Sequence, residues 1–169
     1  MTRAVRAARP SETERLAAIW HEAWHDAHAA LVPAGLAALR TQAHFAERVE
    51  GLRTEDRLLV AGDPALGFAA VDCDELEQLM LAREARGTGA ASALAAAACQ
   101  RIAADGHARA WLLCAVGNER ARRFYEREGW HVAAEVVERL PKDAASPAAP
   151  RFDVPCWRMK RALRGAERS

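Results

Sequence analysis

The residues best suited to chemistry lie in a short glycine-bearing turn, residues 86–91, between a strand-like segment and an alanine-rich helical one. Gly87 and Gly89 flank Thr88, so the backbone can turn tightly there and bring several N–H groups close to a ligand. The following helix would direct its unpaired N–H groups and the positive end of its dipole at the same place, and Arg86 adds a full positive charge. The turn therefore predicts a binding site for phosphate groups.

Two common phosphate-binding patterns do not match this turn. A P-loop needs a lysine directly after its last glycine, and no lysine follows Gly87 or Gly89. A Rossmann turn needs an apolar strand that runs into its first glycine, and an acidic residue that closes a second strand about 20 positions later. Here residues 82–86 are polar, and the next strand-like segment, residues 108–116, ends in Val-Gly-Asn. Neither pattern explains the glycines.

The stretch LMLAREARGTGA resembles instead the acetyl-CoA-binding motif of the GCN5-related N-acetyltransferase (GNAT) family, which is a strand, then Arg/Gln-x-x-Gly-x-Gly/Ala, then a helix. Arg86, Gly89 and Ala91 fill the three fixed places. Residues 116–130 resemble the second signature of the family, in the same order and separation. The residues that match this second signature are Asn118, Ala121, Phe124, Tyr125, Gly129 and Trp130.

This resemblance implies a mixed α/β (α+β) protein with the GNAT acyl-CoA N-acyltransferase fold, in which a central, mostly antiparallel sheet carries helices on both faces. It implies acetyl-CoA as co-substrate and transfer of the acetyl group to a primary amine of a small molecule or peptide, by direct attack in a ternary complex. An acyl-CoA-binding sensor of the same fold, without catalysis, is the first alternative. Family members are often dimers, so a homodimer is one open arrangement.

The resemblance also assigns a cofactor-binding set. The strand before the turn would exchange backbone hydrogen bonds with the pantetheine arm of the cofactor, as an added strand does. Asn118 would cap its helix and bind the same arm, or only cap the helix. Arg120, Arg122 and Arg123 would either meet the 3′-phosphate or form a solvated helix face. The expected cofactor contacts are Leu79, Met80, Leu81, Arg86, Gly87, Thr88, Gly89, Ala90, Ala91 and Asn118.

Acetyl transfer to an amine also needs acid–base groups. A free amine has a pKa of about 10, so a carboxylate, directly or through water, would help to deprotonate it. Glu77 and Glu75 on the expected strand 75–81 are the candidates, with Glu77 preferred and solvent exposure as the alternative for both. Tyr125, the only tyrosine in the chain, is expected to protonate the departing thiolate, unless it merely packs beside Phe124.

The acceptor would bind near the N-terminal helices. Ser11 and Glu14 form a capping-box pattern that predicts a helix start, and a break at residues 32–35 precedes a second expected helix, residues 36–53. In the family that the chain resembles, the first two helices and their loop wall the acceptor pocket. The candidates for acceptor contact, with ordinary packing or solvent exposure as the alternative, are Trp20, Trp24, His25 and His28.

The first helix also contains His21-Glu22-Ala23-Trp24-His25, which matches the H-E-x-x-H pattern of zinc hydrolases. A metzincin would have glycine and a third histidine where this chain has His28 and Leu31, and Glu47 is only an isolated candidate for a third ligand. We therefore expect no metal and keep a zinc hydrolase as a less favoured alternative.

The resemblance and the remaining pattern together imply a single N-acetyltransferase domain over residues 1–169. The expected strands are 58–61 and 65–71, joined as a hairpin, then 75–81, 108–116, 130–140 and 152–159. The last strand resembles a family strand that splays from its neighbour to leave room for the cofactor. Further helices are expected at 89–105 and between Asn118 and Gly129, with a mobile linker at 141–150 and a frayed tail at 161–169.

Composition narrows the remaining classes. The length of 169 residues, with 51% hydrophobic residues and a net charge of +1, suits one globular core and gives no general electrostatic case for nucleic acid or membranes. No apolar run is long enough for a membrane span, and no signal-peptide core precedes the first helix. We expect a cytoplasmic protein. Its cysteines, which we expect to form no disulfide, are Cys73, Cys99, Cys114 and Cys156.

Overall fold

The computed structural model describes residues 4–142 and 147–163, and within them the chain forms a mixed seven-stranded sheet in the order β1-β2-β3-β4-β5-β7-β6. Neighbouring strands are antiparallel except for β4 and β5, which are parallel. The strands are β1 (Val5–Ala7), β2 (Leu58–Ala61), β3 (Gly67–Asp72), β4 (Glu75–Leu81), β5 (Arg109–Ala115), β6 (His131–Leu140) and β7 (Phe152–Ala162).

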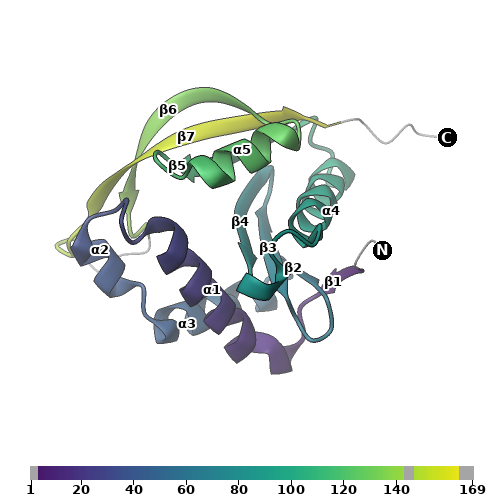
Figure 1. Cartoon of the computed structure of the whole chain (residues 1–169), viewed down its shortest axis with the longest axis horizontal. Helices are drawn as coiled ribbons and strands as arrows, with labels where there is room; N and C mark the ends of the chain where they lie inside the picture. Colours follow the sequence, from purple (N-terminus) through teal and green to yellow (C-terminus); the bar gives the residue numbers. More distant parts are fainter. Residues whose placement is uncertain (1–3, 143–146, 164–169) are drawn as a thin grey trace.

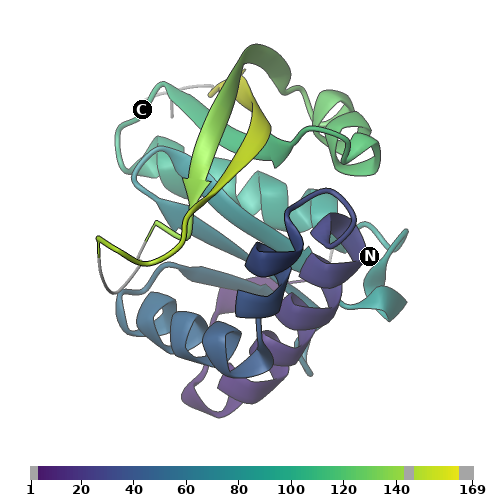
Figure 2. The same cartoon turned by 90° about the vertical axis from the view of Figure 1, so that its left-hand side faces the viewer.

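Helices cover both faces of this sheet, as Figures 1 and 2 show. The helices are α1 (Thr13–His28), α2 (Ala34–Leu39), α3 (Gln42–Thr54), α4 (Ala90–Ala104) and α5 (Glu119–Arg127), and short 3-10 turns lie at Pro10–Glu12 and Arg83–Ala85. Trp20, Phe45 and Phe68 anchor the core under α1 and α3. Leu94 and Ile102 belong to a second core under α4. The predicted fold class, a mostly antiparallel sheet with helices on both faces, is confirmed.

The sheet opens between its two parallel strands. β4 and β5 are in register only at Glu75 and Trp111, where the Trp111 amide donates to the Asp74 carbonyl at 3.0 Å. The prediction that the last strand splays from its neighbour was wrong, because β7 pairs with β5 without a break from Arg109 to Ala115. The gap expected for a cofactor therefore lies beside β4.

Two predictions about the N-terminal helices were wrong. Ser11 and Glu14 do not cap the first helix, because Pro10 begins a 3-10 turn and the Glu12 carboxylate accepts the Arg9 amide instead. The expected single helix at 36–53 is divided into α2 and α3. Thr41 causes this division by leaving the helical conformation and accepting the His44 amide at 3.1 Å, as an N-cap residue does.

Other element bounds fall close to the predicted ones. β3 begins two residues later than expected, at Gly67, and β7 continues to Ala162, two residues into the expected tail. Residues 143–146 of the expected linker and 164–169 of the expected tail lie outside the described residues, so both remain predictions. In the described part of the chain, no helix is both long and apolar enough to cross a membrane.

Candidate active site

The turn before α4 has the backbone conformation that the glycine spacing predicts. Gly87 and Gly89 have φ angles of +73° and +84°, in the left-handed region that side chains other than glycine rarely adopt. A Cβ atom at either position would meet no atom within 4 Å, so the backbone conformation, and not crowding, requires glycine here. Thr88 closes the turn by donating its hydroxyl to the Ala85 carbonyl at 2.6 Å. The open space beside the turn and the free first N–H groups of α4 suit a phosphate group.

Arg86 connects this turn to α1. Its guanidinium donates to the Asp26 carboxylate at 3.0 Å, and Arg83 donates to the same carboxylate at 3.0 Å. These hydrogen bonds lower the pKa of Asp26, so this carboxylate is ionised at neutral pH. Arg86 is therefore held beside the turn, where its positive charge is paired with the negative charge of Asp26.

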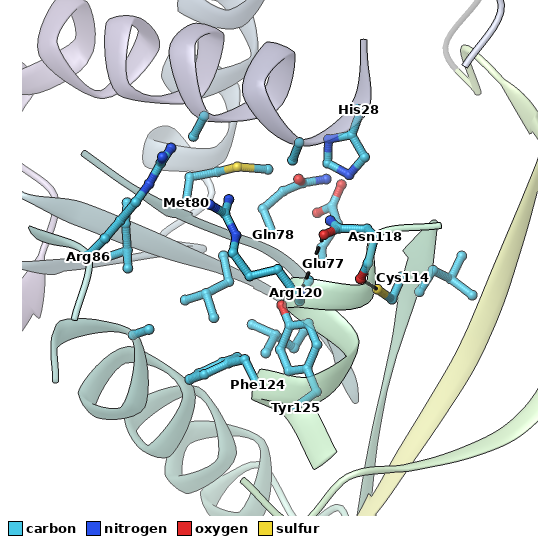
Figure 3. Close-up of a pocket in the computed structure, with 18 of the residues that line it drawn as sticks. His28, Glu77, Gln78, Met80, Arg86, Cys114, Asn118, Arg120, Phe124 and Tyr125 are labelled. Atoms are coloured by element: carbon cyan, nitrogen blue, oxygen red, sulfur yellow. Dashed lines mark hydrogen bonds between the residues drawn. The ribbon is translucent and has the colours of Figure 1, made fainter. Parts of the chain in front are cut away.

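A cavity of about 330 Å³ extends from the turn along the gap between β4 and β5. In the view of Figure 3, Arg86 lies at one end of this cavity, and His28, Glu77 and Asn118 lie at the other. We call it the cofactor cavity. Of the residues predicted to contact the cofactor, those that line it are Leu79, Met80, Leu81, Arg86, Gly87, Ala91 and Asn118, whereas Thr88, Gly89 and Ala90 do not.

The far end of the cofactor cavity is built by the start of α5. The Asn118 side chain accepts the Ala121 amide at 3.3 Å, which confirms the predicted helix cap. Tyr125 lines the same cavity, with its ring edge-on to Phe124 at 5.2 Å, and burial raises the pKa of its phenol. The phenol therefore stays protonated throughout the neutral range.

Cys114 also lines the cofactor cavity, close to Asn118, whose carbonyl its thiol approaches at 3.7 Å. Burial raises the pKa of the Cys114 thiol to about 12. Only a thiolate is an effective nucleophile, so this cysteine is poorly suited to carry an acyl group. All four cysteines of the chain have free thiols.

β4 contains a bulge where it borders the gap. Leu76 is opposite Val71 and Gln78 is opposite Ala70, so Glu77 is an additional residue in the ladder. Glu77 and Gln78, at and beside the bulge, line both cavities at the gap. Leu76 packs in the core under α4.

A second cavity of about 330 Å³ lies on the other side of the gap. We call it the acceptor cavity. Its walls come from α1, α2, α3, β4, β5, β6 and β7, and its charged lining residues are Arg40, Arg48, Glu75, Glu77, Glu138 and Lys142. The two cavities share His28, Glu77, Gln78 and Leu113, so they meet at the point where β4 leaves β5.

The two glutamates predicted as bases have different surroundings. The carboxylate of Glu77 is held between two arginines, with Arg48 at 3.0 Å and Arg57 at 2.5 Å. Burial, together with neighbouring carboxylates, raises the pKa of Glu75 to about 7, although Lys142 acts in the opposite direction. Glu75 is therefore the carboxyl group that changes charge near neutral pH.

The predicted acceptor contacts also differ in exposure. Trp20 lines the acceptor cavity, but it is fully buried, stacked on Phe45 at 4.9 Å and covered by Arg48 at 4.6 Å. Trp24 lines the same cavity and is only half-buried, and its ring lies 5.3 Å from that of His28. Contacts of these residues with an acceptor remain a prediction.

The H-E-x-x-H residues are differently arranged from a zinc site. His21 and His25 have ring centroids 4.5 Å apart, but His25 Nε2 is bonded to the Arg40 carbonyl at 2.8 Å. Glu22 points to Arg83, 3.2 Å away. Across residues 4–142 and 147–163, no group of three or more His, Cys, Asp or Glu side chains could together hold a metal ion.

Much of the acceptor cavity was not identified from the sequence. Glu138, Lys142 and Cys156 come from the C-terminal part of the chain, and Arg40 and Arg48 from the segment around α3. These residues form no local motif, because they meet only when β6 and β7 pair beside β5. The bulge in β4 was also missed, because the strand contains no glycine to mark it.

Comparisons with known proteins agree with this geometry. The sequence model of the acetyltransferase (GNAT) family matches residues 9–130, and no curated protein sequence matches the chain. A GCN5-related N-acetyltransferase from Rhodopseudomonas palustris superposes with a TM-score of 0.70 and 19% identity over 96% of this chain and 97% of that one. Apo YjaB from Escherichia coli gives 0.66 and 22% over 98% and 100%. YncA from Salmonella typhimurium, solved with its cofactor acetyl-CoA, gives 0.68 and 13% over 100% and 98%.

Proposed function

The chain belongs to the GNAT family of acetyltransferases, and we propose that it transfers the acetyl group of acetyl-CoA to a primary amine of a small molecule or peptide. One observation carries this proposal: two cavities meet at the gap between β4 and β5, and only one of them leads to the phosphate turn. A donor and an acceptor could therefore bind at the same time with their reacting groups at the meeting point. Such a ternary arrangement favours direct attack.

The cofactor cavity suits acetyl-CoA along its length. The turn and Arg86 would hold the pyrophosphate, the open edge of β4 would bond to the pantetheine arm, and the thioester would reach Asn118 and Tyr125. A backbone N–H of β4 near the bulge would stabilise the oxyanion. The raised pKa of Cys114 favours direct transfer over an acylated cysteine.

The acceptor cavity suits a cationic amine. Glu75 would bind the ammonium group and take one proton from it, since a pKa of about 7 lets the carboxylate act as a base at neutral pH. We prefer Glu75 to Glu77, because each carboxylate oxygen of Glu77 already accepts a hydrogen bond from an arginine. Tyr125 would return a proton to the departing thiolate.

The first experiment tests the donor by isothermal titration of acetyl-CoA, CoA and ATP. Wild-type protein should bind both CoA species, and Gly89→Glu should weaken their binding more than about 30-fold, because it places a carboxylate beside the pyrophosphate. Gly106→Glu is the matched control. Gly106 follows the opposite end of α4, has a φ of +94°, and also has no atom within 4 Å of an added Cβ.

Equal loss of binding in both variants would show that backbone strain, and not the turn, explains the effect. No binding by folded wild-type protein would refute the assignment of the cofactor cavity.

The second experiment offers acetyl-CoA and a panel of diamines, amino acids and short peptides to the wild-type protein. Acetylated product would support the enzyme. Tight binding without any product would favour the acyl-CoA sensor. Stoichiometric zinc in the purified protein, with hydrolysis lost in His21→Ala, would favour the zinc hydrolase instead.

The free thiols are consistent with the cytoplasmic location that we propose.

A further inference from the structure

His28 lies where the two cavities meet. It is the last residue of α1, and it lines both the cofactor cavity and the acceptor cavity. Figure 3 shows its ring reaching from α1 toward the side of the gap that holds Glu77 and Asn118. An amine that attacks a thioester at the meeting point would pass beside this ring.

The structure determines which nitrogen of His28 can accept a proton. Nδ1 lies 3.1 Å from the Trp24 carbonyl oxygen. A carbonyl oxygen only accepts hydrogen bonds, so Nδ1 must carry the hydrogen, and the lone pair of the neutral ring is on Nε2. Burial lowers the pKa of His28, with the hydrogen bond to Trp24 opposing it, so the ring is neutral at pH 7.

Given the proposed acetyl transfer, on which this inference rests, we propose that His28 is a second catalytic base, whose Nε2 takes a proton from the attacking nitrogen after the N–C bond forms. An ammonium acceptor must lose two protons to become an amide. Glu75 takes the first, before attack. The second becomes far more acidic once the nitrogen has bonded to the carbonyl carbon, and a neutral imidazole is basic enough to remove it.

The proposed reaction balances in bonds and in protons. The N–C bond forms, the C–S bond breaks, and the acceptor gives up two protons. One returns to sulfur through Tyr125, which is then reprotonated, and one leaves to solvent. The other titratable or charged groups that share the two cavities with His28 are Glu75, Glu77, Glu138, Cys114, Cys156, Tyr125, Arg40, Arg48, Arg86, Arg120, Arg127 and Lys142.

An amine that is already neutral at pH 7 separates the two bases. Hydroxylamine is such an amine, so it has no first proton to lose but must still lose the second. With hydroxylamine and acetyl-CoA, His28→Gln should lower kcat about 100-fold with little change in KM, because the second proton still has to be removed. His131→Gln is the matched control, because His131 is an exposed residue at the start of β6.

Three further measurements show whether a loss of activity comes from misfolding or from the missing base. His28→Gln should bind acetyl-CoA within about 3-fold of wild type, since the phosphate turn and β4 are untouched. His28→Ala should regain activity when free imidazole is added, which a purely structural role would not allow. The acidic limb of the kcat profile that belongs to His28 should be absent in His28→Gln.

The outcomes are distinct. If wild-type protein acetylates hydroxylamine and His28→Gln keeps more than a third of its kcat, the assignment of His28 is overturned while the proposed function stands. If wild-type protein binds acetyl-CoA but acetylates neither hydroxylamine nor any panel amine, the proposed function fails, and the assignment of His28 fails with it.

Discussion

Glu75 and Glu77 lie two residues apart on β4, yet their surroundings give the two carboxylates different roles. Glu75 is partly buried near other carboxylates, which raises its pKa, whereas the Glu77 carboxylate is held in ion pairs with Arg48 and Arg57. With an ammonium acceptor, kcat/KM of the wild-type enzyme should therefore rise with pH through about 7 as Glu75 ionises.

Replacing Glu75 with Gln should lower kcat/KM about 100-fold at pH 7.5 and remove this limb of the pH profile. Glu135→Gln serves as the control, because Glu135 is exposed on β6. A limb near pH 7 that persists in Glu75→Gln would assign it to another group.

Replacing Glu75 with Gln should also change the free energy of unfolding, by an amount that depends on pH. The pKa of Glu75 is raised on folding from 4.5 to about 7, so its favourable contribution is present below pH 4.5 and is lost as the pH rises through about 7. At pH 8.5, the free energy of unfolding measured with urea should therefore be about 1 to 3 kcal/mol higher for Glu75→Gln than for wild type. At pH 4 there should be no such gain. A gain that is independent of pH would contradict the raised pKa.

Tyr125 is the acid proposed to protonate the departing thiolate. Burial keeps its phenol protonated, but a raised pKa also makes the phenol a weaker acid for the thiolate. Tyr125→Phe should therefore lower kcat by about 10- to 100-fold while the acceptor KM stays unchanged, because Tyr125 lines only the cofactor cavity. Steady-state kinetics at saturating acetyl-CoA would measure this, and full turnover would remove Tyr125 from the mechanism.

Residue-level features were predictable where they depend on near neighbours in the chain. Gly87, Gly89 and Asn118 act through backbone conformation and a contact three residues away, so their spacing was sufficient to predict them. The preference for Glu77 over Glu75 rested on no such local signal. The two arginines beside Glu77 come from α3 and from the residue before β2, which no spacing along β4 reveals.

At the scale of elements, α1 and the phosphate turn are joined by one carboxylate. Asp26 on α1 accepts hydrogen bonds from Arg83 and Arg86, and it places a negative charge beside the expected pyrophosphate. Asp26→Asn should release Arg86 and tighten the Kd of acetyl-CoA by about 2- to 5-fold, as for an exposed ion pair. Calorimetry at two salt concentrations would measure this, since the gain should shrink at high salt.

Glu22→Gln is the matched control for Asp26, because Glu22 lies one helical turn earlier and pairs with Arg83, whereas Asp26 pairs with both Arg83 and Arg86. Equal tightening in both variants would attribute the effect to general charge. Weaker binding by Asp26→Asn would instead show that Asp26 positions Arg86 for the phosphate.

Element bounds were predictable where propensity and packing agree. The strand 75–81 was predicted with the bounds of β4, because a short polar turn at residues 72–74 precedes it and most of its residues are apolar. The division between α2 and α3 was missed, since leucines and alanines continue the helical spacing up to Leu39. A single side chain, Thr41, decides this break by capping α3.

At the scale of the whole molecule, the sheet consists of two antiparallel parts joined at one narrow place. β1 to β4 form one part and β5 to β7 the other, and the register between them is limited to Glu75 and Trp111. The family resemblance predicts a mostly antiparallel sheet, but the position of the gap does not follow from the sequence of β4 or β5, because neither shows which strand it pairs with. The gap is evident only from the pairing of the strands, which between β4 and β5 is limited to one pair of residues.

A ligand that fills this gap should stabilise the molecule as an added strand would. At 100 times its Kd, acetyl-CoA should raise the free energy of unfolding by about 2.7 kcal/mol, which for a chain of this size is about 5 to 10 °C in Tm.

Hydrogen exchange should slow most at the β4 and β5 amides that face the gap, and at the first turn of α4. ATP has phosphates but no pantetheine arm, so it should protect the first turn of α4 at most. Acetyl-CoA that protected α4 and left β4 and β5 unchanged would place the arm outside the gap, and the two-cavity mechanism would then lose its donor.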